Sequence, residues 1–277
     1  MSYESKARLE AIHWESYTAE ALRRGIPTWV DVRNATPLGG FAHIFGDPET
    51  ERGLRGKYKE QLIELVGSKS GWVLDIGCGA GWLCLELARL GLKVHGIDIS
   101  PGQIEAARTY LISIQEREQK QYNVVYELAD LNCISLEAGK YTAVVSWDSL
   151  HHIQNLERLF GEVRKAMQHN GLILCFEHVG GPLQKVRNFA AHLLRKPASP
   201  FEDVGARDLV GVFHRHFDVL RSERVLPFAC FVAQGLGLYR WPVGKAAALR
   251  AIKLVDSLFE RWGVLPGEYA ILYGLRS

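Results

Sequence analysis

Three glycines alternate at Gly77, Gly79 and Gly81, in the segment GWVLDIGCGAGW that covers residues 71–82. Glycine has no Cβ atom, so the backbone here can turn sharply and come close to a ligand. The three glycines follow the apolar run at the start of this segment and precede a helical pattern. In such a context a loop cradles a nucleotide-like molecule. Trp82 stands where the last glycine of the dinucleotide fingerprint G-x-G-x-x-G would fall, and no G-K-[ST] follows, which excludes a Walker loop.

Carboxylates accompany the apolar runs around this loop. Asp98, in the segment VHGIDIS, ends the second expected strand 17 positions after Gly81, where a carboxylate can accept hydrogen bonds from both hydroxyls of a ribose. An acid at this place would equally serve a nicotinamide cofactor. Asp130 follows the run NVVYEL and either binds a ligand or caps a helix. Asp75 lies inside the first strand, where a free carboxylate is costly unless it is hydrogen-bonded.

Histidines are the candidates for proton transfer. His151 and His152 lie in the segment SWDSLHHI, and His178 follows the next apolar run. Imidazole titrates near neutral pH and is therefore the commonest side chain that removes a proton from a hydroxyl. Glu177 could orient an imidazole or bind a polar substrate. Packing or capping of the following helix is the alternative for one of the two adjacent histidines.

The elements that must position these residues alternate between strand and helix from Trp72 onward. Strands are expected over 72–76, 92–99, 123–128, 141–147, 172–178, 217–225 and 268–275, the last antiparallel, and helices over 81–91, 100–115, 155–167 and 245–262. Ser100 and Pro101 mark a helix start, and Asn170-Gly171 is expected to end a helix. The pattern predicts an α/β fold with a doubly wound, mostly parallel, seven-stranded sheet of the Rossmann-like type. Ligands bind such a sheet beyond the carboxyl ends of its strands.

The composition is that of an ordinary globular protein. The 277 residues are 47% hydrophobic and 23% charged, and a net charge of +2 gives no reason to expect nucleic acid as a partner. Five cysteines without a C-x-x-C pair argue against disulfides and structural zinc, and His214 and His216 lack the pattern of a metal site, so no metal is expected. The amino terminus lacks the apolar core of a signal peptide, and no apolar run reaches the roughly 18 residues of a membrane span. The sequence therefore predicts a cytoplasmic protein without a transmembrane segment.

Four segments occur in a recognisable order: VLDIGCGAG, VHGIDIS, ELADLN and VVSWDSLHHI. Together they resemble the motifs of class I S-adenosylmethionine-dependent methyltransferases, over roughly residues 58–180. The resemblance implies S-adenosyl-L-methionine as the cofactor. The residues that it implies for cofactor binding are Asp75, Gly77, Cys78, Gly79, Asp98, Ile99, Asp130, Leu131 and Trp147.

The resemblance also implies a role for several of these residues. Gly77 and Gly79 would line the methionine and ribose part of the cofactor. Asp130 would accept a hydrogen bond from the adenine amino group, with Leu131 against the ring. Asp75 would steady the glycine loop and reach the amino group of the ligand.

The segment SWDSLHHI is similar to that of the small-molecule branch of the family, which includes enzymes that methylate quinone rings. It implies a small organic acceptor, apolar or aromatic, methylated at oxygen with His151, His152 or His178 as the catalytic base. A D/N-P-P-Y/F signature is absent after the fourth strand, which argues against nucleobase amino groups. The alternatives are a carbon methyltransferase on a quinone or lipid-like ring, a non-catalytic cofactor-binding scaffold and a nicotinamide oxidoreductase.

Two regions depart from the common pattern of the family. Residues 1–57 are expected to form a helical lid, with a helix over 7–24, and residues 58–277 the methyltransferase domain, with 182–214 and 227–266 as helical substrate-cap insertions. The lid contributes the candidate pocket residues Trp14, Tyr17, Trp29, Phe41, His43 and Phe45. The helix over 245–262 presents an apolar face made of Leu249, Ile252, Val255, Phe259 and Trp262. This insertion can cap a hydrophobic substrate, form the face of a homodimer or touch a membrane, and its few basic residues favour the first two.

Overall fold

A computed structural model of the chain describes residues 3–23, 48–183, 208–238, 241 and 243–277. The candidate lid residues Trp29, Phe41, His43 and Phe45, and the side chain of Tyr17, lie outside the described residues. Most of the expected insertion over 182–214 lies outside them as well.

Seven strands form one sheet in the order β3-β2-β1-β4-β5-β7-β6. The strands are β1 (Trp72–Ile76), β2 (Lys93–Asp98), β3 (Val124–Leu128), β4 (Tyr141–Trp147), β5 (Met167–His178), β6 (Asp218–Val225) and β7 (Tyr269–Leu275). β7 runs antiparallel to both of its neighbours, and the other pairs are parallel. The doubly wound, mostly parallel sheet expected from the alternation of strands and helices is confirmed.

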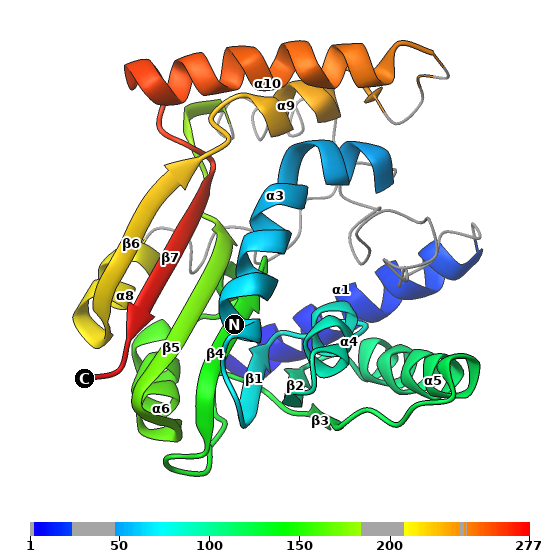
Figure 1. Cartoon of the computed structure of the whole chain (residues 1–277), viewed down its shortest axis with the longest axis vertical. Coiled ribbons are helices and arrows are strands. Elements are labelled where there is room, and N and C mark those ends of the chain that lie inside the picture. The colour runs from blue at the N-terminus through cyan, green and yellow to red at the C-terminus, as the bar shows by residue number, and fades with distance from the viewer. Residues whose placement is uncertain (1–2, 24–47, 184–207, 239–240, 242) are drawn as a thin grey trace.

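Helices cover both faces of this sheet (Figure 1). They are α1 (Tyr3–Arg23), α3 (Pro48–Gly67), α4 (Trp82–Arg89), α5 (Pro101–Glu118), α6 (Leu156–Ala166), α8 (Leu209–His216), α9 (Ala229–Gly235) and α10 (Lys245–Trp262), with a short 3-10 helix η1 (Leu150–His152). One buried cluster joins the sheet to α3, α4, α5, α9 and α10, and a second joins its other face to α6 and α8. Among the described residues, no helix is long and apolar enough to cross a membrane.

The fifth strand begins earlier than the sequence indicates. The helix expected over 155–167 ends at Ala166, and β5 starts at Met167 rather than at Leu172. The pairing with β4 shifts between these two positions, and Asn170 adopts a left-handed φ of +59°. Asn170-Gly171 therefore marks an irregularity inside the strand instead of the end of the helix.

Helix α10 has the bounds that the periodicity predicts, but it buries only part of its apolar face. Leu249 and Ile252 are 5% and 7% exposed, whereas Trp262 is 68% exposed. Asp256 completes the buried side, because its Oδ1 accepts hydrogen bonds from the amides of Phe228 and Ala229 at the start of α9. Trp262 is thus not part of the packed face.

Helix α3 extends across the boundary expected between residues 57 and 58, and it carries three buried charged side chains one turn apart. Glu51, Arg55 and Lys59 are each 0% exposed. The Arg55 guanidinium donates to Glu51 at 3.0 Å and to Oδ2 of Asp148 at 2.7 Å, and it lies 5.5 Å from the centre of the Trp147 ring. Lys59 lies 2.9 Å from Glu51, and burial lowers its pKa to about 8 against the opposing charge of Glu51. These ion pairs fix α3 to the end of β4.

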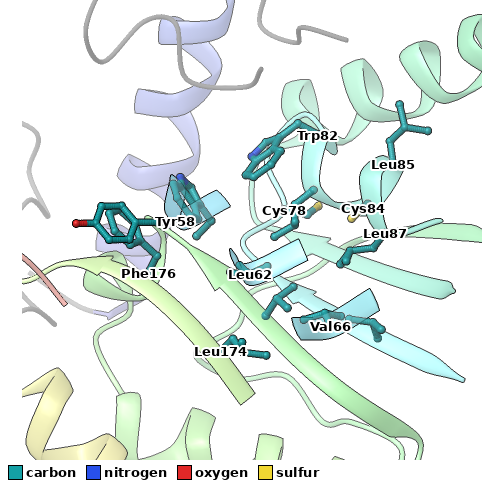
Figure 2. Packing of buried hydrophobic residues seen from close by; sticks show 14 of the residues in the cluster. Tyr58, Leu62, Val66, Cys78, Trp82, Cys84, Leu85, Leu87, Leu174 and Phe176 are labelled. Atoms are coloured by element: carbon teal, nitrogen blue, oxygen red, sulfur yellow. The ribbon is translucent and has the colours of Figure 1, made fainter. Parts of the chain in front are cut away.

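A polar group also lies beneath the glycine loop. Asp75 of β1 is 2% exposed, and its Oδ2 accepts a hydrogen bond from the Cys84 thiol at 3.1 Å. Figure 2 shows Cys78 of the loop and Cys84 of α4 close together in this part of the core. A Cβ atom at Gly96 would lie 2.7 Å and 2.9 Å from their two sulfur atoms, so this strand position requires glycine. Burial raises the pKa of Asp75 to about 7, and the negative charge of Asp98 adds to that effect.

Replacing Arg55 tests the buried ion pairs. We expect Arg55→Met to lower the free energy of unfolding by about 3–5 kcal/mol, because it leaves Asp148 buried without its paired cation, while Glu51 keeps Lys59. Urea denaturation is the measurement, and Asp148→Asn combined with Arg55→Met should recover part of the loss. The exposed pairs of Arg215 provide the control, since Arg215→Met should change stability by about 1 kcal/mol or less. Equal losses at both arginines would contradict this interpretation.

Replacing Asp75 tests its raised pKa. The folded protein keeps a proton on Asp75 up to about pH 7, whereas the unfolded chain loses it near pH 4. Stability therefore falls as the pH rises from about 4 to 7, by at most about 1.4 kcal/mol per pH unit. Asp75→Asn should abolish this contribution, so that the variant gains stability relative to wild type across that window in urea titrations. Asp218→Asn, at an exposed position, is the control, and a parallel pH dependence of Asp75→Asn and wild type would refute the prediction.

Candidate functional site

Hydrogen bonds join the carboxyl ends of the central strands. The Gly77 amide donates to the carbonyl of Ile97 at 2.9 Å, which links the glycine loop to β2. The Ser149 hydroxyl donates to the carbonyl of Ile76 at 2.7 Å, which links the segment after β4 to β1. The candidate residues after different strands therefore lie along one edge of the sheet, as expected for a parallel α/β fold.

The three loop glycines have different reasons to be glycine. All have positive φ angles, of +67° at Gly77, +52° at Gly79 and +81° at Gly81. A Cβ atom at Gly77 would lie 2.4 Å from that of Ser149, and one at Gly81 would lie 2.3 Å from the Tyr126 hydroxyl, so neighbouring side chains fill both places. At Gly79 the nearest atom would be 3.7 Å away. Gly79 is therefore the loop position at which a ligand has room to approach the backbone.

Asp98 is held in place by two backbone amides. Its Oδ2 accepts a hydrogen bond from Gly79 and its Oδ1 one from Ser100, both at 2.9 Å. Burial raises the pKa of Asp98, and these amide hydrogen bonds oppose the rise. Each oxygen retains a second lone pair, and Asp98 and its neighbour Ile99 are only half-buried. The carboxylate is thus preorganised to accept hydrogen bonds from hydroxyl groups.

Asp130 organises the turn after β3. Its Oδ1 accepts hydrogen bonds from the backbone and side-chain amides of Asn132, both at 2.9 Å, so it caps a turn and not a helix. The Asn132 side chain in turn accepts the amide of Gln154 at 2.9 Å. Leu131 is 4% exposed and belongs to the buried cluster on the α6 side of the sheet. The half-buried Asp130 therefore orders the turn after β3, and Leu131 lies in the core beside it.

Glu177 at the end of β5 is the centre of the site. It is 0% exposed, and its oxygens accept hydrogen bonds from the Ser146 hydroxyl at 2.6 Å and from the amides of Ser149 and Leu150 at 3.0 Å and 2.9 Å. Nδ1 of His151 lies 3.2 Å from Oε2. Because a carboxylate only accepts, the proton of this pair lies on Nδ1 and the lone pair of His151 on Nε2. The structure thus presents His151 as an oriented imidazole.

Asp148 adjoins this pair from the other side. Its Oδ1 lies 4.0 Å from Nδ1 of His151, and its Oδ2 accepts the hydrogen bond from Arg55. Burial alone would raise the pKa of Asp148, but the Arg55 guanidinium, together with the neighbouring imidazoles of His151 and His178, outweighs it and lowers the pKa to about 2. Asp148 is therefore ionised near neutral pH. Its backbone adopts a left-handed φ of +58°.

His152 contacts both helix α1 and His151, whose ring centre lies 4.1 Å from its own. Its Nδ1 lies 3.1 Å from Oε1 of Glu10, and its ring meets the Trp14 ring edge-on at 5.5 Å. Burial lowers the pKa of His152, and the adjacent His151 lowers it further. This histidine is therefore neutral near pH 7 and packed beneath α1.

His178 and Trp147 border the site on the buried side. His178 is 7% exposed, and its ring meets those of His151 and Tyr269 edge-on at 5.7 Å and 5.3 Å. Trp147 is stacked on Phe176 at 4.3 Å. The Nε1 atom of Trp147 is buried without a hydrogen-bond partner among the described residues, so this donor fits a bound ligand.

The sequence interpretation missed four residues of this arrangement. Asp148 lies in the quoted segment SWDSL, and an acid directly after a strand was a usable signal. Arg55 could have been found from the charges spaced one helical turn apart in α3. Ser149 follows the same strand as Asp148 and shares that signal, whereas Glu10 gave none, because its partner His152 is distant in sequence.

Comparison with known proteins places this chain in a family. The family model described as a methyltransferase domain matches residues 51–216. The ubiquinone biosynthesis O-methyltransferase of Coxiella burnetii is 30% identical over 140 residues, which are 50% of this chain and 53% of that protein. The enzyme of the same name from Dechloromonas aromatica is 32% identical over 125 residues, which are 43% and 50% of the two chains. The chain thus spans about half the length of these curated relatives.

A solved structure agrees in fold. Geranyl diphosphate C-methyltransferase from Streptomyces coelicolor A3(2), in complex with Mg²⁺, geranyl diphosphate and S-adenosyl-L-homocysteine, has a TM-score of 0.57 and 15% identity, covering 84% of this chain and 82% of that one. Identity this low supports the fold alone. The resemblance carried by the four sequence motifs is nevertheless confirmed by the family model. Because the matched residues exceed half of the chain and include the glycine loop, Asp98 and His151, the protein belongs to the methyltransferase domain family.

Proposed function

We propose that this protein transfers a methyl group from S-adenosylmethionine to an oxygen atom of a small organic acceptor, with His151 as the general base. The observation that carries the proposal is the Glu177–His151 pair at the edge that also holds the glycine loop and Asp98. The family membership and the names of the curated relatives support it.

The chain's residues fit this cofactor. The cofactor supplies a methyl group activated on a sulfonium, so the protein has to position two reactants and manage one proton. Asp98 is the residue proposed for the ribose and Asp130 for the adenine amino group. Gly79 has room for the close approach of a ligand, and the unpartnered Trp147 Nε1 offers a donor. Asp75 is proposed to steady the glycine loop from below, because its carboxyl accepts a hydrogen bond from the Cys84 thiol.

His151 is proposed to take the proton of the acceptor hydroxyl. Its Nδ1–H donates to Glu177, which fixes the ring and leaves the lone pair on Nε2. The buried carboxylate also stabilises the imidazolium that forms when Nε2 takes the proton. Proton removal makes the acceptor oxygen a stronger nucleophile as it meets the methyl group.

The other two histidines fit supporting roles better. His152 is occupied by its contact with Glu10, and its lowered pKa makes it a weak base. His178 packs against His151 and is proposed to limit the position of that ring. Both assignments are distinct from the earlier expectation that any of the three could act as the base.

The acceptor is proposed to be apolar or aromatic. The curated relatives are named for ubiquinone biosynthesis, and the region after residue 227 places α9 and α10 against α3. The lid over residues 1–57 and the caps over 182–214 and 227–266 remain proposals, as do a cytoplasmic location and a homodimer. Carbon methylation and a cofactor-binding scaffold without turnover are the rival functions.

Two measurements test the proposed function. Calorimetry should detect binding of S-adenosylhomocysteine, and its absence would overturn the proposal. Transfer of tritiated methyl from S-adenosylmethionine into a cell extract should label a small product. Mass spectrometry and NMR of that product should place the methyl on oxygen; a carbon-bound methyl would favour the first rival, and binding without any labelled product would favour the scaffold.

Asp98→Ala tests the cofactor site. We expect the Kd for S-adenosylhomocysteine to rise by about 10- to 150-fold, which corresponds to the roughly 1.5–3 kcal/mol of hydrogen bonds to a charged group. Calorimetry measures the affinity, and circular dichroism checks that the variant is folded. Asp218→Ala, at an exposed position on β6, is the control. An unchanged Kd for Asp98→Ala would remove this residue from the site.

His151→Gln tests the base. We expect kcat to fall by about 10²- to 10⁴-fold, the usual contribution of a general base, while the Kd for S-adenosylhomocysteine stays within about twofold. His214→Gln is the matched control, because His214 is exposed and bonded to Ser222 outside the site. A kcat close to wild type in His151→Gln would refute the role of His151.

A further inference from the structure

Helix α1 brings a buried carboxylate to the site from outside the residues that the family model matches. We propose that Glu10 is a further cofactor-binding residue, whose Oε2 accepts a hydrogen bond from one ribose hydroxyl while Asp98 accepts one from the other. The inference rests on the proposed function, since it concerns how the same cofactor is held.

The first observation is an unsatisfied oxygen. Glu10 is 6% exposed, and its Oε1 accepts a hydrogen bond from Nε1 of Trp14 at 2.7 Å and lies 3.1 Å from Nδ1 of His152. Its Oε2 is buried and has no hydrogen-bond partner among the described residues. A buried carboxylate oxygen without a donor is costly, and a ligand hydroxyl would supply that donor.

The second observation is the path of α1. The helix packs on α5, where a Cβ atom at Gly102 would lie 3.9 Å from Cγ of Glu15. Gly102 follows Asp98 by one short turn, and further along the contact Trp14 reaches His152. Helix α1 thus contacts both the start of α5, after Asp98, and the histidine segment, which Glu10 itself reaches at His152. Burial raises the pKa of Asp98, and the negative charge of Glu10 contributes to that rise.

The chemistry of the pair favours a diol. Two carboxylates near each other repel unless hydrogen-bond donors lie between them. Each oxygen of Asp98 already accepts a hydrogen bond from one backbone amide. If Glu10 accepts one of the two ribose hydroxyls, Asp98 has to accept only one further hydrogen bond instead of two. Because each hydroxyl has one hydrogen to donate, vicinal hydroxyls can supply one bond to each carboxylate. A ribose carries such a pair.

The test compares ligands that lack one hydroxyl. The Kd values of S-adenosylhomocysteine and its 2′-deoxy and 3′-deoxy analogues are measured by calorimetry for wild type and Glu10→Met. We expect Glu10→Met to weaken binding of S-adenosylhomocysteine roughly tenfold. One of the two deoxy analogues should bind wild type roughly tenfold more weakly than S-adenosylhomocysteine does. In Glu10→Met, the Kd values of this analogue and of S-adenosylhomocysteine should differ by no more than about twofold. The other hydroxyl should still matter in Glu10→Met.

A control variant separates the carboxylate of Glu10 from the general charge of helix α1. Glu15→Gln changes an exposed carboxylate on the same helix and should keep the Kd within about threefold of wild type. The inference is overturned if Glu10→Met binds S-adenosylhomocysteine as wild type does, if both deoxy analogues lose affinity equally in the two proteins, or if Glu15→Gln weakens binding as much as Glu10→Met. Failure of wild type to bind S-adenosylhomocysteine would overturn the proposed function as well.

Discussion

The site depends on one buried carboxylate. Glu177 has no exposed surface, so protein groups must donate the hydrogen bonds that water would otherwise donate to its carboxylate. The donors come from the end of β4 and the segment after it: a serine hydroxyl, two consecutive amides and an imidazole. The chain can present those amides because Asp148, just before them, adopts a left-handed φ of +58°, and Arg55 holds Asp148 in that conformation. Satisfying Glu177 therefore determines where His151 lies.

The same requirement reaches the glycine loop. Ser149 donates its amide to Glu177 and its hydroxyl to the carbonyl of Ile76, and its Cβ occupies the space that a side chain at Gly77 would need. The segment that holds the proposed base and the loop that faces the proposed cofactor are thus packed against each other. A shift of either one would disturb the other. The rigid contact therefore fixes the distance between the proposed base and the proposed cofactor.

The sequence predicts the frame better than the site. Apolar runs and the Ser100–Pro101 start signal predict the strands and α5 because they depend on local pattern and capping, and the Ser100 side chain does accept the amide of Gln103. The start of β5 at Met167 escapes prediction because a strand irregularity and a helix end both use Asn-Gly. The exposure of Trp262 on α10 cannot be predicted from the sequence, since periodicity identifies an apolar face but not how much of that face its neighbours cover.

Motifs identify single residues, but not the partners that give them their chemistry. His151 and Glu177 are 26 residues apart, and Arg55 and Asp148 are 93 residues apart, so neither pair is visible as a local spacing. A buried charge such as Arg55 is also improbable from composition alone, because arginine is almost never fully buried unless it is paired. These partners become apparent only when the strand order brings the ends of β1, β4 and β5 together.

The charges around this edge also bear on turnover. Asp98, Asp148 and Glu177 lie along it, and Arg55 pairs directly with Asp148. A low-dielectric edge with excess negative charge attracts a cationic ligand and holds a neutral one less firmly. A sulfonium donor is cationic before methyl transfer, and the thioether that it leaves behind is neutral. Under the proposed function, the carboxylates at this edge therefore hold the donor more firmly than its product, without any movement of the core.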